Sequence, residues 1–310
     1  MRRLRRYMQA DVFADRAGAG NPLAVVLDAE GLSDDDMQAI ARWTRLPETT
    51  FVLPALDADS SYRLRIFSPR REVPFAGHPS VGTAHAVLEA GLATPCAGFL
   101  VQDGTAGKLP LRVHGEGATQ TIAVRTPPSR LLETASAGDP RLVSVLAGLP
   151  LGELPPALME GGRRWWLVEM ADEASLRGAM PDWPAICALA EATGSMGLCV
   201  FARSDDPVYY LAVRAWVGFP APFEDAASGA ANASLAAWLA MRGALPGEGG
   251  FYRISQGREV GHDAIIELTV DENGDVWSGG RVTSVVRGEL DWNAAGTDMG
   301  AGPAAAVTRA

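Results

Sequence analysis

Cysteine is scarce in this sequence, and the usual cofactor motifs are missing. The 310 residues contain three widely spaced cysteines, Cys96, Cys187 and Cys199. This odd, low count offers no disulfide framework and suits a reducing compartment. The sequence has no CxxC or HExxH pattern, no GxGxxG after a strand and no GxxxxGK[ST]. We therefore expect no metal site and no nicotinamide, flavin or nucleotide cofactor.

Long apolar runs and net positive charge are also missing. No apolar stretch is long enough to span a bilayer. The arginine-rich start MRRLRRYMQADVF lacks the apolar segment of a signal peptide, because Gln9 and Asp11 follow at once. The net charge of −10 argues against a nucleic-acid partner and against anionic membrane surfaces. These absences predict a cytoplasmic protein that binds neither nucleic acid nor membranes.

The chain does have enough apolar material for two cores. Apolar residues make up 47% and charged residues 21% of a chain of 310 residues, which is a globular composition and a comfortable length for two domains. A stretch rich in Pro, Ser, Ala and Gly at 127–140 marks the crossing between them. We expect domains at 1–127 and 128–280, with 281–293 returning to the first and a disordered Gly/Ala-rich tail at 294–310.

Periodicity and capping signals predict mixed helices and strands. Ser33, followed by three aspartates, is expected to cap a helix that ends near Thr44. Gly91 lies where a C-cap glycine would close a helix from about Pro79 to Glu89. Strands are expected at 7–13, 23–27, 62–67, 98–102, 109–114, 119–125, 164–170, 197–203, 208–216, 251–255, 263–270 and 281–287, and further helices at 140–147, 183–192 and 226–241.

Two segments of the sequence resemble each other at a constant offset of 147 residues. YRLRIFSPRREVPFAGHPSVGTAHAVL aligns with YYLAVRAWVGFPAPFEDAASGAANASL, so that Tyr62 meets Tyr209 and Gly82 meets Gly229. Each copy reads as a strand, a loop of similar length and a helix whose first turns are almost entirely Ala, Ser, Thr and Gly. The repeat predicts two domains of similar plan, related by a pseudo-twofold axis.

The small residues at the two helix starts indicate an anion site. Small side chains leave the first backbone N–H groups accessible, and these groups and the helix dipole attract negative charge. Two such starts facing each other across a cleft would bind a small carboxylate. They would also stabilise the charge that develops when a C–H group beside that carboxylate loses its proton.

Three titratable residues are candidates for the chemistry. His78 occupies a cap-like position before Pro79, where histidine is a poor choice, so a functional and a packed neutral histidine are both open. Asp225 occupies the same position in the second copy and is an excellent N-cap, but a His and an Asp facing one cleft could also share a proton. For Glu48, in PETTF, the local pattern alone favours an exposed carboxylate at the start of a strand.

Other polar and aromatic residues near these helices are weaker candidates. Ser228 could donate a hydrogen bond to a ligand, whereas His85 and Asn232 are expected to pack on helix faces. The Trp165–Trp166 pair is expected to pack in a strand, with one ring in the wall of the cleft.

These motifs resemble those of the PhzF family, the phenazine-biosynthesis isomerases. The segments DVFADRAGAGNPLAVVLDAEGLSDDDMQAIARWTRLPETTFVLP and YRLRIFSPRREVPFAGHPSVGTAHAVLEAG carry the resemblance, and PFEDAASGAANASL, QGREVGH and SGGRVTSVVRGEL add to it. It implies an α+β, diaminopimelate-epimerase-like fold. In that fold two pseudo-twofold-related domains, each a mostly antiparallel sheet or barrel around a central helix, enclose the active site in the cleft between them. The resemblance also implies a homodimer.

The resemblance further implies a cofactor-independent isomerase that shifts a proton within a small conjugated cyclic carboxylic acid, such as the dihydro-hydroxyanthranilate of phenazine antibiotic biosynthesis. The family's glutamate, which removes and returns the proton, maps to Glu48. Its histidine maps to His78 and its aspartate to Asp225, which would hold and polarise the substrate. Burial in a closed cleft should raise the pKa of Glu48. The expected substrate-binding residues at the helix starts are Gly77, Pro79, Ser80, Ser228, Gly229 and Ala230.

The second motif departs from the family pattern. Asp-Pro-x-Thr-Gly-Ser becomes DAASGA at 225–230, and Asn232 stands where a histidine is common in the family. Because the resemblance implies that these positions contact the substrate, the substrate can differ from the phenazine precursor. An amino-acid epimerase or racemase is a rival, although such enzymes usually need two opposed thiols and none of the three cysteines lies in the motifs. A non-catalytic small-molecule-binding protein of the same fold is the other alternative.

Overall fold

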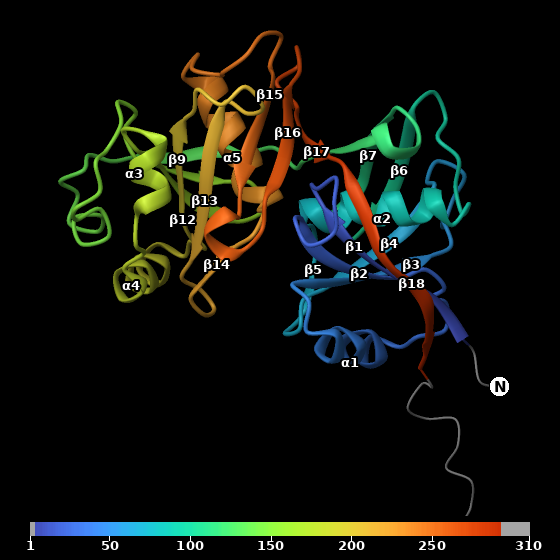
Figure 1. The fold of residues 1–310 in the computed structure, drawn as a ribbon. Helices are drawn as coiled ribbons and strands as arrows, with labels where there is room; N and C mark the ends of the chain where they lie inside the picture. The colour runs from blue at the N-terminus through green and yellow to red at the C-terminus, as the bar shows by residue number, and fades with distance from the viewer. Residues whose placement is uncertain (1–3, 293–310) are drawn as a thin grey trace, which may run out of the picture.

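The computed structural model describes residues 4–292 and places them in two lobes that lie side by side (Figure 1). The tail expected at 294–310 lies outside the described residues. The N-terminal lobe contains β1 (Leu4–Val12), β2 (Asn21–Val26), α1 (Asp34–Thr44), β3 (Glu48–Leu53), β4 (Tyr62–Phe67), β5 (Glu72–Val73), α2 (Gly77–Glu89), β6 (Phe99–Gly104), β7 (Gly107–His114), β8 (Thr121–Arg125) and β18 (Val282–Asp291). The C-terminal lobe contains β9 (Arg130–Thr134), β10 (Ala157–Glu160), β11 (Arg164–Glu169), α3 (Glu173–Gly178), α4 (Trp183–Thr193), β12 (Gly197–Arg203), β13 (Leu211–Val217), β14 (Phe223–Asp225), α5 (Gly229–Met241), β15 (Phe251–Gln256), β16 (Ala264–Val270) and β17 (Val276–Gly280).

The strand pairings of the two lobes follow the same plan. In the N-terminal lobe β1–β2 is antiparallel, β2–β3 parallel, β3–β4 antiparallel and β4–β6 parallel, and β7 and β8 follow antiparallel. Strands β10 to β17 repeat these pairings in the same order. An additional strand pairs with the first strand of each set, β18 with β1 and β9 with β10. The repeat confirms the predicted pair of similarly built α+β domains.

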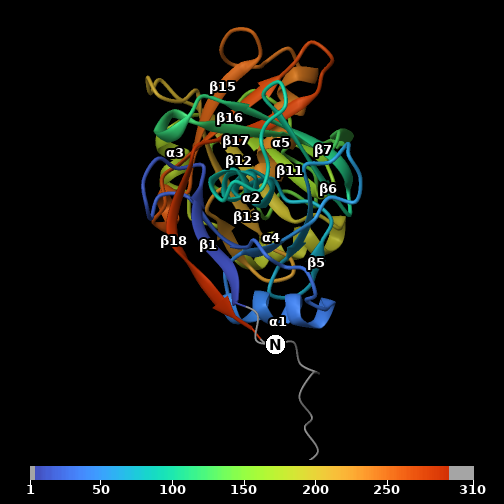
Figure 2. The same ribbon diagram turned by 90° about the vertical axis from the view of Figure 1, so that its right-hand side faces the viewer.

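Each lobe is wrapped around one central helix. Helix α2 contacts β1, β2, β3 and β8, and helix α5 contacts β10, β11, β12 and β16. Figure 2 looks onto the N-terminal lobe, where α2 lies at the centre of the strands. Both helices are built almost wholly from small and aliphatic residues and are buried on nearly all sides, as expected for a helix without a polar face. The predicted sheet around a central helix is therefore confirmed in both halves.

The two lobes are joined by strand pairing as well as by the chain. Strand β8 pairs antiparallel with β17, so that Trp277 lies opposite Arg125. One apolar core runs through both lobes and includes residues of α2 and α5. We propose the two lobes as the domains at 1–127 with 281–293 and at 128–280. Among residues 4–292, no helix combines the length and the apolar character needed to cross a membrane.

Local capping signals predicted helix α1 correctly. Ser33 and Asp36 form a reciprocal capping box, in which the Ser33 side chain accepts from the Asp36 backbone N–H and the Asp36 side chain accepts from the Ser33 N–H. The helix ends at Thr44, as expected. Both signals act within one turn of the helix, so they do not depend on the rest of the fold.

One prediction in the middle of the chain was wrong, and one strand was missed. The helix expected at 140–147 is a series of turns, closed by a mixture of i to i−3 and i to i−4 bonds such as those from the Leu142 and Val143 N–H groups to Asp139 O. Strand β9, inside the expected crossing at 127–140, was not predicted, because its largely exposed side chains give no alternating apolar pattern.

The offset of the internal repeat was also wrong. The first residues of β4 and β13, Tyr62 and Leu211, differ by 149 positions (211 minus 62), and the first residues of α2 and α5, Gly77 and Gly229, differ by 152 (229 minus 77). The second copy has the longer loop between strand and helix. The constant offset of 147 therefore aligned the two helices out of register.

Candidate active site between the two lobes

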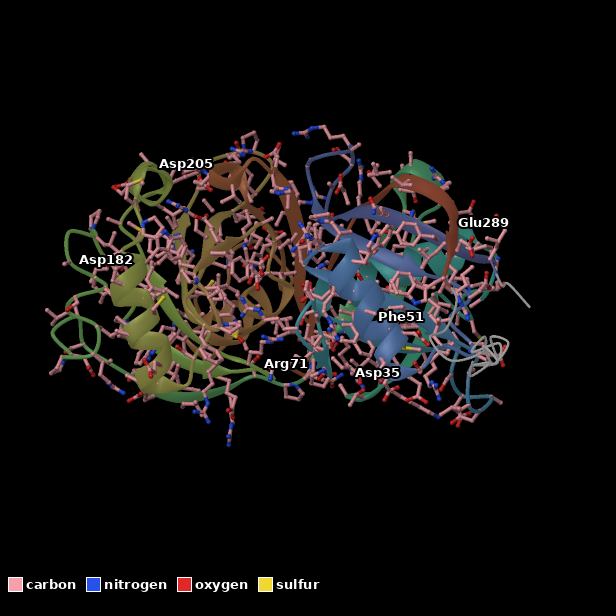
Figure 3. All side chains as sticks on the ribbon, turned by 90° about the horizontal axis from the view of Figure 1, so that it is seen from below. Asp35, Phe51, Arg71, Asp182, Asp205 and Glu289 are labelled. Atoms are coloured by element: carbon pink, nitrogen blue, oxygen red, sulfur yellow. The ribbon has the colours of Figure 1, made fainter. Side chains whose placement is uncertain are left out.

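A cavity of about 620 Å³ lies between the two lobes and takes its lining from both. The N-terminal lobe contributes the start of β3, the β4–β5 turn and the start of α2. The C-terminal lobe contributes the β10–β11 turn, β14 and the start of α5. Figure 3 labels Arg71, a lining residue, at the border of the two lobes. The three predicted titratable residues, Glu48, His78 and Asp225, all line this cavity.

Glu48 is the first residue of β3, where the parallel pairing with β2 places it opposite Leu23. Its side chain is 17% exposed, so the exposed carboxylate that the local pattern favoured is wrong. Burial, with a smaller effect of the nearby Asp225 charge, raises the pKa of Glu48 to about 8, and Arg163 opposes this rise. The predicted direction of the pKa shift is confirmed.

His78 lies inside helix α2 rather than at its cap. The helix begins at Gly77, and its N-cap is Ala76, whose side chain makes no capping bond. The predicted cap position was wrong by two residues. The His78 ring is nearly buried, and burial lowers its pKa to about 3, which keeps the imidazole neutral. Its Nε2 atom lies 3.4 Å from Oε2 of Glu48 and has no hydrogen-bond partner among the residues that the structure covers.

Asp225 is the last residue of β14 and not the N-cap of α5. The cap is Ser228, whose side chain accepts from the Ala231 N–H at 3.4 Å. The Asp225 carboxylate accepts hydrogen bonds from Asn21 Nδ2 at 3.1 Å and from the Ala227 N–H at 3.3 Å. Burial raises the pKa of Asp225 in spite of these donors. Asp225 is therefore not the repeat partner of His78 but a group held in place across the cavity.

The starts of α2 and α5 touch each other at two glycines. A Cβ atom on Gly77 would lie 3.1 Å from Cα of Gly229, and one on Gly229 would lie 3.0 Å from Cα of Gly77. A Cβ atom at either position would force the two helix starts apart by a few tenths of an ångström. The predicted meeting of two helix starts at one cleft is thus observed, although the register of the repeat was wrong.

Four backbone N–H groups at this junction have no partner within residues 4–292. They belong to Gly77 and His78 in α2 and to Gly229 and Ala230 in α5. Each pair lies at the positive end of its helix dipole, and all four residues line the cavity. The arrangement can bind an anion with four donors from two helices.

The other expected substrate-binding residues are divided between the cavity and the core. Ser228 lines the cavity, but its N–H donates to Gln256 Oε1 at 3.2 Å. Pro79 and Ser80 are buried outside the lining. The Ser80 hydroxyl donates to Ala76 O at 3.0 Å and accepts from Gln102 Nε2 at 3.0 Å, so it stabilises the helix start from behind.

Among the weaker candidates, some line the cavity and others pack elsewhere in the lobes. Asn232 is fully buried and donates to Gln256 Oε1 at 2.8 Å, outside the cavity lining. His85 contacts Ser284 Oγ at 2.9 Å, two turns further along α2 than His78. Both therefore have the packing role expected from the residue pattern, and Asn232, which the family resemblance placed at the substrate, lies outside the cavity lining. Trp165 lines the cavity, whereas Trp166 packs in the core of the C-terminal lobe.

Sequence reasoning missed several polar residues of the site, among them Asn21 and Arg163. Asn21 orients Asp225 and also donates to Ala227 O at 2.9 Å, and Arg163 lines the cavity from the β10–β11 turn. The only signal for Asn21 was the turn-rich DRAGAGNP segment, and the sequence around Arg163, GGRRWW, reads as a hairpin turn. Neither pattern indicates a ligand.

Metal ligands and thiols are not gathered at the cavity. Within the described part of the chain, no group of three or more His, Cys, Asp or Glu side chains could hold a metal ion. Cys96, Cys187 and Cys199 all lie outside the lining. A pair of opposed thiols, as a two-cysteine epimerase would need, is therefore not available at this site.

Comparison with known proteins places the chain in a family. The family model described as "Phenazine biosynthesis-like protein" (PhzC-PhzF) matches residues 10–288. Antisense-enhancing sequence 1 of Schizosaccharomyces pombe is 30% identical over 292 residues, which cover 91% of this chain and 97% of that protein. The trans-2,3-dihydro-3-hydroxyanthranilate isomerase of Pseudomonas aeruginosa is 32% identical over 263 residues, covering 83% of this chain and 87% of that enzyme.

Solved structures support the same assignment for the fold. The PhzF-family phenazine biosynthesis protein of Bacillus anthracis matches with a TM-score of 0.79 and 22% identity, covering 93% of this chain and 99% of that one. The two-lobed architecture is of the diaminopimelate-epimerase type. The chain therefore belongs to the PhzC-PhzF family of phenazine biosynthesis-like proteins and is a PhzF-family isomerase.

Proposed function

We propose that Glu48 is the acid–base group that moves one proton within a small conjugated cyclic carboxylic acid. The observation that supports this most is the position of its carboxyl group in the cavity, 3.4 Å from the neutral ring of His78, with a pKa raised to about 8. A group whose pKa lies close to the working pH can both accept and return a proton.

The proposed proton shift balances without a co-reactant. Ionised Glu48 takes the proton from a ring carbon, and the electron pair of that C–H bond delocalises through the double bonds toward the substrate carboxylate. The protonated Glu48 then returns the proton to a carbon further along the conjugated system. One C–H bond breaks, another forms and the double bonds move, while Glu48 ends in the ionised form in which it began.

The two helix starts would bind the carboxylate of the substrate. The N–H groups of Gly77, His78, Gly229 and Ala230 are donors fixed by the backbone, so they need no rearrangement when negative charge spreads into the carboxylate. Such preorganised donors are among the largest contributions to catalysis. The neutral His78 ring offers a further donor to ionised Glu48 or to the substrate. Asp225, held by Asn21, would accept an N–H or O–H group of the substrate.

The named activity of the Pseudomonas aeruginosa relative makes trans-2,3-dihydro-3-hydroxyanthranilate the first substrate to test. Proton NMR in heavy water would follow its loss and the entry of deuterium into the ring. We expect turnover by the wild type and a reduction of roughly 10²–10⁴-fold in Glu48→Gln, the usual contribution of a positioned acid–base group. The matched control is Glu272→Gln, which changes an exposed carboxylate in the turn between β16 and β17.

The outcomes separate the parts of this proposal. A Glu48→Gln enzyme with wild-type turnover would exclude Glu48 as the acid–base group. An inactive wild type would exclude the phenazine precursor as the substrate and direct the search to other ring acids, starting from the change to Ala230. We further propose that the enzyme is a cytoplasmic homodimer. Light scattering after size-exclusion chromatography would show a mass of one chain if the dimer is wrong.

A further inference from the structure

Four arginines surround the cavity, in a protein whose net charge is −10. They are Arg45, Arg70, Arg71 and Arg163. None of the four has a carboxylate within ion-pair distance in the range 4–292. The lining carboxylate Glu224, in contrast, is already neutralised by the buried Arg214 at 2.8 Å. Glu48 and Asp225 also line the cavity, so four guanidinium groups face two further carboxyl groups and positive charge is in excess.

Arg163 is the innermost of these arginines. It extends from the β10–β11 turn, is half-buried, and its Nη1 donates to Met196 Sδ at 3.3 Å, although a thioether is a weak acceptor. Burial lowers the pKa of the Arg163 guanidinium, and the charges of Glu48 and Asp225 raise it in part. Neither Glu48 nor Asp225 lies within ion-pair distance of Arg163 among residues 4–292, so this guanidinium has no close counter-charge. Burying a guanidinium without an anion is costly.

Arg71 approaches the same region from the opposite lobe. It lies in the turn between β4 and β5, at the border of the lobes in Figure 3. Its positive charge further lowers the pKa of Arg163, so the two guanidinium groups repel each other across the cavity. An anion between them would replace this repulsion with attraction to both lobes.

We propose that Arg163 and Arg71 together bind a second anionic group of the substrate, and that the natural substrate is a small dianionic ring acid. This inference rests on the proposed function, in which the first carboxylate occupies the helix starts. The planar guanidinium groups match the geometry of a carboxylate or a phosphate, which they can bind with two parallel hydrogen bonds each. The second oxyanion would bridge the two lobes and so couple substrate binding to their closure.

The test measures the affinity of three ring acids by titration calorimetry. Benzoate carries one carboxylate, isophthalate carries two, and 3-phosphonobenzoate carries a carboxylate and a phosphonate. The variants are Arg163→Gln, Arg163→Lys and Arg71→Gln. The matched control is Arg42→Gln, because Arg42 is exposed on α1 and lies outside the cavity lining. Thermal unfolding of each variant verifies that it is folded.

We expect the wild type to bind at least one of the two dianions roughly 10- to 100-fold more tightly than benzoate, as charge-assisted hydrogen bonds would provide. Which dianion binds best identifies the second group as carboxylate or phosphoryl. Arg163→Gln should remove this preference and leave the benzoate affinity within about twofold. Arg163→Lys should retain part of the preference for dianions, since lysine keeps the positive charge but lacks the planar guanidinium group that donates two parallel hydrogen bonds. Arg71→Gln should also weaken it, and Arg42→Gln should leave it unchanged.

Three results would overturn the inference. The first is equal affinity of the wild type for benzoate and both dianions. The second is an Arg163→Gln enzyme whose affinity for benzoate falls as much as its affinity for the dianions. The third is no binding of any of the acids at millimolar concentration. Glu48→Gln should keep the dianion preference, because Glu48 acts on the ring proton and not on the second anion. A preference for dianions with Glu48-independent exchange would thus reject the proposed function alone. Glu48-dependent exchange without the preference would reject this inference alone.

Discussion

At the residue scale, Glu48, His78 and Asp225 are governed by one physical effect. Burial disfavours the charged form of each group, so it raises the pKa of Glu48 to about 8, raises that of Asp225 and lowers that of His78 to about 3. The first two groups therefore bind protons more readily than free carboxyls, whereas His78 stays neutral at physiological pH. A proton acceptor beside a neutral donor is the combination that a proton shift requires.

The pH dependence of the reaction should follow Glu48. The base form is the ionised carboxylate, and its fraction grows as the pH rises through about 8. We expect kcat/KM to increase with pH, by close to tenfold per unit below that pKa, and to level off above it. The profile should show no second inflection near pH 6.5, because His78 does not titrate there. Initial rates at constant ionic strength measure this directly.

A pH profile of kcat/KM with its midpoint near the ordinary pKa of a glutamate would contradict the assignment of Glu48 as the base. So would a decrease in kcat/KM as the pH rises from 6 to 8, since the base would then act in its protonated form.

At the element scale, the contact between α2 and α5 determines where the donors of the site lie. Gly77 and Gly229 allow the two helix starts to approach until each Cα would lie within 3.1 Å of a Cβ on the other glycine. Four N–H groups then converge on one side of the junction. A side chain at either glycine would separate the donors without unfolding either helix.

Gly77→Ala should therefore affect activity far more than stability. Replacing glycine by alanine lowers the conformational entropy of the unfolded chain, a gain of about 0.4–1 kcal/mol, which offsets much of the strain from a contact at 3.1 Å. We expect the free energy of unfolding to change by less than about 1 kcal/mol and kcat/KM to fall by roughly tenfold or more, because small displacements of positioning groups are costly. Urea unfolding and steady-state kinetics provide the two values.

Gly178→Ala is the control for this substitution. An added Cβ atom at Gly178, the last residue of α3, would meet no atom within 4 Å. That variant should retain wild-type kinetics. Wild-type activity in Gly77→Ala would show that the approach of the two helices does not position the reacting groups.

At the scale of the whole molecule, two lobes around one cavity imply movement during the reaction. The cavity of about 620 Å³ is large for a single-ring acid, since pockets of 300–1,000 Å³ hold drug-sized ligands. Closure of the lobes would remove the excess space and the water within it. The β8–β17 pairing connects the lobes and is a natural place for such a hinge.

Closure should be visible as a change in molecular size. We expect the radius of gyration from small-angle X-ray scattering to decrease when the enzyme is saturated with isophthalate, relative to the free enzyme at the same ionic strength. Arg163→Gln should show a smaller decrease, because it removes one side of the proposed bridge between the lobes. An unchanged radius in the saturated wild type would mean that the cavity works in the open form.

The sequence by itself determined the elements whose signals are local and supplied the candidates for the reacting side chains. The capping box of Ser33 and the alternating faces of 62–67 each act within a few residues, and both elements have the expected bounds. The repeated small-residue helix starts were also visible, because a helix buried on all sides must be apolar all round. Glu48, His78 and Asp225 were found through motifs, that is, through residue type and order.

Only the tertiary structure decided the register of the repeat and the residues that surround each site residue. Capping propensity placed His78 and Asp225 at helix caps, but the longer loop in the second copy puts Ser228 there and leaves Asp225 on a strand. Asn21 donates a hydrogen bond to Asp225, which lies 204 positions later in the sequence. Arg163 lines the cavity from the C-terminal lobe, opposite the lobe that contains Asn21 and Glu48. Such contacts arise from the packing of the two lobes against each other, and local propensity carries no information about them.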